Sequence, residues 1–222
     1  MILEFGFAIR CESWDFMARV LKEYPQIAIK PESLDDRLDF GAIFGRDSKV
    51  HFEIGSGRGT FLVNEALAKP DEDFFGVEWC SKIYRYAMDR IGRWGVSNVR
   101  IIRTDAAWLI KEHVADETIS CFHIYFPDPW PKKRHNRRRF VNEENLEQML
   151  RCLKKGGMIK LATDHADYFE QMQRVLDHPA VEKVEFFKTS GAQGQGEWAG
   201  TNFERKYLAQ GREIYTLAGT KK

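Results

Sequence analysis

The sequence predicts an α/β fold in which a mostly parallel β-sheet carries helices on both faces. From residue 49 onward, short apolar runs typical of strands alternate with amphipathic stretches typical of helices, an order that favours parallel strands. A glycine-rich loop joins the first strand to the first helix. Ligands of such sheets bind beyond the carboxyl ends of the strands, so we expect the functional site at that edge.

Acidic residues at the strand ends are the further observation behind this prediction. Five successive predicted strands finish at or just before an acid, and these acids are Glu53, Glu78, Asp105, Asp128 and Asp164. Carboxylates also favour helix N-termini for structural reasons, so each acid taken alone has a second interpretation as a helix cap. The set of five favours a ligand site.

The predicted elements follow one another in a regular order. We expect strands over residues 49–55, 73–79, 98–105, 118–126 and 157–164, with late strands over 181–187 and 212–219. We expect helices over residues 61–69, 81–94, 106–113, 142–157 and 165–177. Asn142 is the expected N-cap of the fourth of these helices, and Gly156 with Gly157 its expected end. Residues 1–48 are expected to form an N-terminal helical and loop appendage with a helix ending near Pro25, and residues 49–222 the main domain.

Length and composition limit the classes of function. With 222 residues, 43% of them apolar and 30% charged, the chain suits one domain, or one domain with additions, around a sizeable core. The net charge of +1 excludes a polycation, so attraction to nucleic acid must come from local clusters. No apolar stretch approaches the roughly 20 residues that a membrane helix needs, and no signal-peptide pattern is present, so we expect no membrane association.

The four cysteines are scattered along the chain. They form no CxxC pair and show no histidine spacing typical of zinc, so we expect no metal site. Cys121 lies in an apolar run, which predicts a buried free thiol, and the whole pattern favours a reducing, cytoplasmic compartment.

The loop EIGSGRG suits a nucleoside-containing cofactor. It places Gly55, Gly57 and Gly59 between a strand and a helix, where glycine permits a tight turn and close approach of a ligand. Glu78 lies 19 residues after Gly59 and can accept hydrogen bonds from ribose hydroxyls. Dinucleotide sites use the longer GxGxxG spacing and hold a pyrophosphate on helix amides. This loop is one residue tighter and follows an acid, Glu53, which suits the cationic end of S-adenosylmethionine. A P-loop is excluded because no GK[ST] follows.

Residues 125–139 read YFPDPWPKKRHNRRR and combine one acid with many cations. Asp128 lies between two prolines that stiffen the turn, and it can orient a base or offset positive charge that develops on the base. Trp130 suits either stacking on a base or packing in the core. The cations are expected to hold a nucleic-acid backbone, with a solvated loop as the alternative; they are Lys132, Lys133, Arg134, Arg137, Arg138 and Arg139.

The remaining polar groups have less specific interpretations. Asp105 would lie near the adenine of a bound cofactor or would cap the helix over 106–113. Asp164 is a candidate second carboxylate facing the acceptor, and His165 is expected to start a helix rather than act in catalysis. A glycine-rich loop over residues 191–200 is able either to close over a substrate or to serve as a surface connection.

Taken together, EIGSGRG, GVEW, FPDPWPKKRHNRRR, LATDHADYF and TNFERKYLAQGREIY resemble the bacterial tRNA (guanine-N7-)-methyltransferase family. The resemblance runs in order from about residue 49 to 219, and the FPDPWPKKRHxxRR block is its most distinctive part. It implies a class I S-adenosylmethionine-dependent methyltransferase fold, Rossmann-like, with a final antiparallel strand. It also implies tRNA as partner and the variable-loop guanine at position 46 as target, in a monomer or homodimer.

The resemblance further implies a role for individual residues. The cofactor or its immediate surroundings would be contacted by the glycine loop with Gly55, Gly57 and Gly59, and by Glu53, Glu78, Asp105 and Asp128. Asp128 would also be the catalytic acid. The substrate would be contacted by Lys132, Asp164, Thr201, Asn202, Phe203 and Glu204.

Guanine N7 carries a lone pair and no proton, so its methylation depends on positioning and electrostatics rather than on a base. We therefore expect Asp128 and Asp164 to hold guanine through its N1–H and exocyclic amine, with a general-base role for Asp128 left open. Two rival functions are a base methyltransferase directed at an exocyclic amine and a non-catalytic RNA-binding module. The acid between the prolines argues against the first, and the intact cofactor residues argue against the second.

Overall fold

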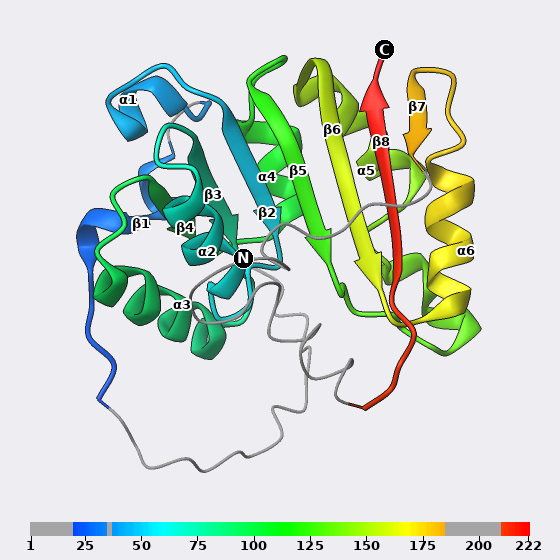
Figure 1. Cartoon of the computed structure of the whole chain (residues 1–222), viewed down its shortest axis with the longest axis horizontal. Coiled ribbons are helices and arrows are strands. Elements are labelled where there is room, and N and C mark those ends of the chain that lie inside the picture. Colours follow the sequence, from blue (N-terminus) through cyan, green and yellow to red (C-terminus); the bar gives the residue numbers. More distant parts are fainter. Residues whose placement is uncertain (1–19, 35–36, 185–209) are drawn as a thin grey trace, which may run out of the picture.

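The centre of the fold is a mostly parallel sheet that includes strands from both ends of the described chain (Figure 1). A computed structural model describes residues 20–34, 37–184 and 210–222. Within them the strand order is β1-β4-β3-β2-β5-β6-β8-β7, and β1 to β6 run parallel. β8 is antiparallel to its neighbours β6 and β7, which confirms the final antiparallel strand. The strands are β1 Ala28–Ile29, β2 Val50–Ile54, β3 Asp73–Val77, β4 Val99–Ile102, β5 Ile119–Tyr125, β6 Leu153–Thr163, β7 Val181–Val184 and β8 Tyr215–Lys221.

Helices cover both faces of this sheet, as predicted. Figure 1 shows α2 and α3 on one side of the sheet and α4 and α5 on the other. The helices are α1 Phe40–Phe44, α2 Thr60–Ala68, α3 Ser81–Trp94, α4 Ala106–His113, α5 Glu143–Cys152 and α6 Ala166–Val175. Short 3-10 turns are η1 Pro25–Ile27, η2 Pro31–Ser33 and η3 Lys133–Arg138.

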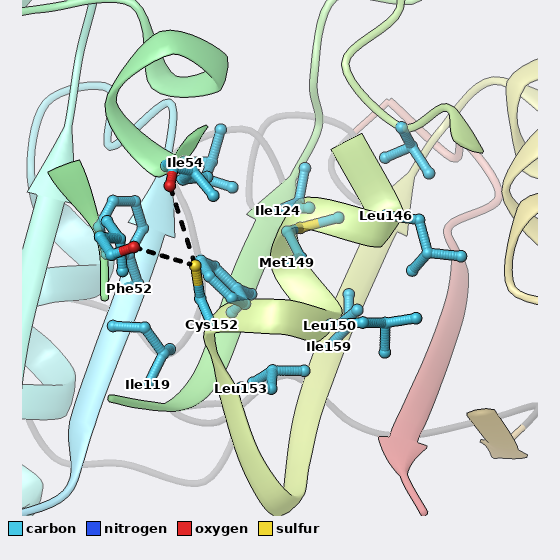
Figure 2. Packing of buried hydrophobic residues seen from close by; sticks show 14 of the residues in the cluster. Phe52, Ile54, Ile119, Ile124, Leu146, Met149, Leu150, Cys152, Leu153 and Ile159 are labelled. Carbon is cyan, nitrogen blue, oxygen red and sulfur yellow. Dashed lines mark hydrogen bonds between the residues drawn. The ribbon is translucent and has the colours of Figure 1, made fainter. Parts of the chain in front are cut away.

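Two apolar clusters fill the space between the sheet and its helices. In the larger one, Met149 and Leu150 of α5 pack with Phe52, Ile124 and Ile159 from three neighbouring strands (Figure 2). The smaller cluster lies between the sheet and helices α2 and α3. Burying one such side chain contributes about 1.5–3 kcal/mol, so these clusters fix the strand ends that carry the site.

Most predicted elements lie where the sequence placed them, and the end of α5 is the main exception. Asn142 caps α5 as predicted, since its side chain accepts a hydrogen bond from the amide of Asn145. The expected stop at Gly156 and Gly157 is wrong, because α5 ends at Cys152 and β6 begins at the next residue. Leu153 is fully buried and pairs with Ile119 of β5, so sheet formation overrides the glycine signal.

The described part of the predicted appendage packs on the same sheet. β1 pairs with β4, and the neighbouring Ile27, Leu38 and Phe40 are buried in the two clusters. Neither β1 nor α1 was predicted. The helix expected to end near Pro25 falls mainly on residues 1–19, which lie outside the described residues, and residues 20–24 are not helical. The domain boundary after residue 48 stays a prediction.

Candidate active site

The glycine loop after β2 is a tight turn whose backbone requires glycine. Gly55, Gly57 and Gly59 have φ angles of 75°, 54° and 72°, in the left-handed region that side chains disfavour. Gly59 also lies close to α3, where an added Cβ would approach Ala87 and Ile91 to 3.3 Å. The turn therefore brings its backbone to the carboxyl edge of the sheet without side chains in the way.

Glu53 ends β2 as a buried carboxylate beside this loop. It is only 4% exposed, and its Oε2 has no hydrogen-bond partner. Burial, followed by repulsion from Glu78 and Glu65, raises the pKa of Glu53 well above its ordinary value. An orphaned buried acceptor of this kind is a ready partner for a cationic N–H donor.

Glu78 follows β3 and faces Glu53 across the loop. Its Oε2 accepts a hydrogen bond of 2.9 Å from the Gly57 amide, and its Oε1 accepts one of 2.8 Å from the Cys80 amide. Burial raises the pKa of Glu78, and repulsion from Asp128 raises it further, while the two amides oppose the shift. The carboxylate is thus fixed in place at the mouth of the loop.

Four amides of the loop donate to acceptors within the protein and so are not free to bind a phosphate. The amides of Gly55 and Ser56 both donate to the Val77 carbonyl, the Gly57 amide donates to Glu78, and the Gly59 amide donates to the Ser56 carbonyl. Two carboxylates beside these amides would repel a pyrophosphate. The donor set therefore fits S-adenosylmethionine, with Glu53 aimed at a cationic group and Glu78 able to accept from ribose hydroxyls.

Asp105 serves as the N-cap of α4 in this fold. Its Oδ1 accepts a hydrogen bond of 2.8 Å from the Trp108 amide and so caps α4, as the alternative interpretation had it. The residue lies three positions beyond the end of β4 and is exposed. Contact with the adenine stays a prediction.

Asp128 lies beyond the end of β5 on a turn with an unusual backbone. Phe126 and Trp130, on either side of it, have positive φ angles of 52° and 44°, which cost about 1–3 kcal/mol each for residues of this type. The Phe126 amide donates to the Ala162 carbonyl of β6 and anchors the start of the turn. Asp128 is exposed, yet partial desolvation by its surroundings raises its pKa. Backbone strain of this kind is common at functional sites, which favours a functional role for the turn.

The cations that follow Asp128 divide into an exposed group and one buried member. Lys132, Lys133, Arg134, Arg137 and Arg138 are all exposed, and most of them lie on η3. Desolvation lowers the pKa of the neighbouring His135 imidazole, and the positive charges of this group lower it further. Five exposed cations in seven residues form a surface suited to a polyanion.

Trp130 has a partner that sequence analysis did not foresee. The Arg138 guanidinium lies 4.9 Å from the centre of its ring, at cation–π distance, and the ring of His135 meets it edge-on. Trp130 is half-buried, so it is packed against the basic segment rather than within the core. Its side chain helps to hold the shape of that segment.

Arg139 corrects the expectation that all six cations face the nucleic acid. It is 1% exposed, donates from Nε to the Pro129 carbonyl at 2.8 Å and from a terminal nitrogen to Gln171 at 3.0 Å, and pairs with Asp167. Its guanidinium also lies 4.8 Å from the centre of the Tyr168 ring. Reaching a phosphate would break all of these contacts. Arg139 instead fastens the Asp128 turn to α6.

Asp164 and the C-terminal substrate residues are only partly described. Asp164 follows β6, is half-buried, and pairs with Arg212 at 2.7 Å. His165 precedes α6 as expected, and its Nδ1 is buried without a hydrogen-bond partner. The predicted contacts at Thr201, Asn202, Phe203 and Glu204 and the loop over 191–200 lie outside the described residues.

Sequence analysis missed two exposed aromatic side chains at the same edge. Trp79 follows Glu78 and is 59% exposed, and Trp108 lies in the first turn of α4 and is 43% exposed. The available signal was their position shortly after strand-end acids, one residue after Glu78 and three residues after Asp105. They add apolar surface beside the carboxylates.

Comparison with known proteins decides the family. A family model described as a putative methyltransferase matches residues 47–217. A protein of Idiomarina loihiensis named tRNA (guanine-N(7)-)-methyltransferase is 33% identical over 208 residues, which cover 90% of this chain and 81% of that protein. A Streptococcus thermophilus protein of the same name is 30% identical over 199 residues, covering 89% and 92%. The chain belongs to the tRNA (guanine-N7-)-methyltransferase family.

Solved structures outside this methyltransferase family share its fold. The 30S ribosomal A1408 methyltransferase from an uncultured bacterium superposes with a TM-score of 0.55 at 15% identity, covering 84% of this chain and 96% of that one. The precorrin-6y C5,15-methyltransferase of Geobacter metallireducens gives 0.53 at 18%, covering 89% and 100%. At such identities the likeness shows the class I methyltransferase fold alone. No helix in the described parts of the chain is long and apolar enough to cross a bilayer.

Proposed function

We propose that this chain transfers a methyl group from S-adenosylmethionine to N7 of a tRNA guanine, at position 46 of the variable loop. Family membership supports the reaction. The observation that carries the proposal is the position of Asp128, which lies close enough to Glu78 for the two charges to repel, while Glu78 in turn repels the orphaned Glu53. Asp128, which would hold the acceptor guanine, thus lies at the same edge of the sheet as Glu53 and Glu78, which would hold the cofactor.

The cofactor residues hold and orient rather than react. S-adenosylmethionine supplies an electrophilic methyl group on its sulfonium when it is bound. Glu53 would hold the amino group of its methionine part, since Oε2 lacks any other donor. Glu78, fixed by two backbone amides, would accept from the ribose hydroxyls. Placing the reacting atoms in line supplies much of the acceleration in a transfer of this kind.

On the acceptor side, Asp128 and Asp164 would hold guanine by its N1–H and exocyclic amine. Asp128 is placed for this by its turn and by the Arg139 contact to the Pro129 carbonyl. Asp164 is already paired with Arg212, so guanine would share or displace that contact. The product is a cationic purine, and carboxylates beside it lower the free energy of the developing charge.

The exposed cations would bind the tRNA backbone around the target base. Lys132 lies nearest to the Asp128 turn in sequence and would reach the substrate close to the site. Lys133, Arg134, Arg137 and Arg138 would contact phosphates farther away. Neutralising phosphates releases counterions, which makes this binding strongly salt-dependent.

The deciding experiment identifies the methylated atom. The protein is incubated with labelled S-adenosylmethionine and unmodified tRNA, and the nucleosides are then separated. The proposal expects 7-methylguanosine, and expects its loss when the guanine at position 46 is replaced by adenine. Methyl label on an exocyclic amine would support the amine-directed rival instead. Absence of both product and cofactor binding would support a non-catalytic RNA-binding module.

A further inference from the structure

Three ligand-type side chains that the proposed reaction does not use meet on one face of the sheet, next to the cofactor residue Glu53, which pairs with His123 in the strand register. His51 of β2 stands opposite Cys121 of β5 in the strand register, and His123 lies two residues farther along β5 on the same face. One ligand atom from each of the three lies within 4.8 Å of the others. They are 8%, 4% and 1% exposed respectively, so the cluster is enclosed.

Each outer nitrogen of the two imidazoles lies beside a side-chain oxygen. His123 Nδ1 lies 2.8 Å from the Tyr125 hydroxyl, and His51 Nε2 lies 2.9 Å from Glu72 Oε2. The second contact is close but poorly aligned, so His51 Nε2 has no true hydrogen bond. A carboxylate or hydroxyl behind each imidazole is the usual outer support of a metal ligand, because it fixes the ring and its tautomer.

The inner nitrogens face one another. His51 Nδ1 and His123 Nε2 are 2.9 Å apart, with the Cys121 thiol beside them. Two imidazole nitrogens on one zinc ion, each about 2.0–2.1 Å from it, stand about 3.3 Å apart in tetrahedral geometry. A shift of a few tenths of an ångström would open the imidazole pair to a metal ion, and the Cys121 sulfur, within 4.8 Å of the nitrogens, would move toward the ion as well.

We propose that His51, Cys121 and His123 form a binding site for one divalent transition-metal ion of the zinc type. Two imidazoles and one thiolate are ligands that zinc prefers, and hard cations such as magnesium and calcium prefer oxygen instead. The fourth position is left to a water molecule. The ion would tie β2 to β5, the two strands whose carboxyl ends lead to Glu53 and to the Asp128 turn.

Binding of the metal ion shifts one imidazole proton and releases one thiol proton. Without metal, one ring donates its inner N–H to the other. On binding, the donor ring shifts this proton to its outer nitrogen, where it faces the Tyr125 oxygen if the ring is His123 and Glu72 if the ring is His51, so that both inner nitrogens offer lone pairs. Cys121 loses its thiol proton to solvent as the sulfur–metal bond forms.

Charges around the cluster are close to balanced. Glu72 and Glu65 are paired with Lys69, with the closer contact, Lys69 to Glu65, at 2.8 Å. Lys160 of β6 stands opposite His123 in the register. One thiolate added to this set offsets half of the charge of a divalent ion, and Glu72 behind His51 offsets part of the rest.

Cobalt provides the test, because a cobalt–thiolate bond absorbs in the near ultraviolet and cobalt bound to imidazole or carboxylate alone does not. The full chain is stripped with a chelator under reducing conditions and titrated with Co²⁺, and Zn²⁺ is then added. We expect one cobalt per chain, a thiolate absorption that zinc removes, and a rise in melting temperature. The rise should be about 5–10 °C when free zinc exceeds its Kd a hundredfold.

Cys152 offers a matched control. It is a second fully buried cysteine, packed with α5 on the other face of the sheet (Figure 2). Cys121→Ser should lose the absorption and most of the thermal shift, and Cys152→Ser should keep both. A wild-type chain that lacks the cobalt–thiolate absorption, or the zinc-dependent rise in melting temperature, overturns the proposal. This holds whether or not the Cys121→Ser variant folds. Equal loss in Cys152→Ser overturns it as well, and the three residues would then form a hydrogen-bonded chain only.

Discussion

Glu53→Gln should weaken cofactor binding and at the same time stabilise the cofactor-free protein. The substitution keeps the shape of the side chain and removes its charge. Glu53 is 4% exposed and its Oε2 has no donor, so the folded, cofactor-free protein holds a carboxylate whose charge is disfavoured by burial and by repulsion from Glu78 and Glu65. The same carboxylate is the group that would bind the cationic end of S-adenosylmethionine. One substitution therefore has opposite effects on stability and on binding.

The structure sets the size of both effects. Burial and repulsion from Glu78 and Glu65 disfavour the charge of Glu53, and each unit of pKa shift corresponds to about 1.4 kcal/mol, so Glu53→Gln should raise the free energy of unfolding by about 1 kcal/mol or more once Glu53 is ionised. A hydrogen bond to a charged group contributes about 1.5–3 kcal/mol, so the Kd for S-adenosylmethionine should rise about 10- to 150-fold.

The stabilisation should depend on pH in a defined direction. Burial raises the pKa of Glu53 above its unfolded value of 4.5, so between these two pKa values the folded state binds more protons than the unfolded state. Stability contributed by this group is present below 4.5 and is lost as pH rises through the folded-state pKa. The advantage of Glu53→Gln over wild type should therefore grow with pH across that interval and then level off.

Urea unfolding from pH 4 to 9 and calorimetric titration with S-adenosylmethionine measure the two effects. Glu65→Gln is the matched control, because Glu65 is also buried but is paired with Lys69 at 2.8 Å. That variant should lose stability and keep normal cofactor affinity. A Glu53→Gln protein that is less stable than wild type, or that binds S-adenosylmethionine as tightly, would refute the reasoning.

Three further predictions concern the Asp128 turn and the cations after it. Asp128→Asn should lose most turnover and keep cofactor affinity, and near-normal turnover in a methyl-transfer assay would contradict its role. Replacing Arg137 and Arg138 by Ala should weaken tRNA binding and flatten its salt dependence by roughly 0.7–0.9 log units per lost phosphate contact, measured by filter binding. Arg139→Ala should instead lower the free energy of unfolding by about 3 kcal/mol, because the buried guanidinium bonds the turn to α6, and Arg137→Ala should change it by less than about 0.5 kcal/mol. Equal unfolding midpoints for these two variants would show that Arg139 is not the fastening residue.

Local patterns in the sequence determined the order of strands and helices because each depends on neighbouring residues. The apolar run over 118–126 becomes β5 almost residue for residue, and Asn142 caps α5 as its position predicted. The glycines of the EIGSGRG loop form the tight turn that the sequence predicted, and all three adopt left-handed φ angles. The prediction from sequence failed where pairing with a distant strand competed with a local signal. Gly156 and Gly157 were expected to end α5, and pairing with β5 drew that segment into β6 instead.

The sequence by itself determined the fold class, the family and the strand-end acids, because all of these are written in contiguous motifs. The tertiary structure decided which side chains are free to act. Arg139 reads as one more cation of the basic run, and only folding shows that Asp167, Gln171 and a backbone carbonyl bury it. His51 lies 72 residues from His123, too far for any spacing rule, and the pairing of β2 with β5 brings them together. Burial and partnership depend on contacts across the sheet, and a linear pattern carries no record of them.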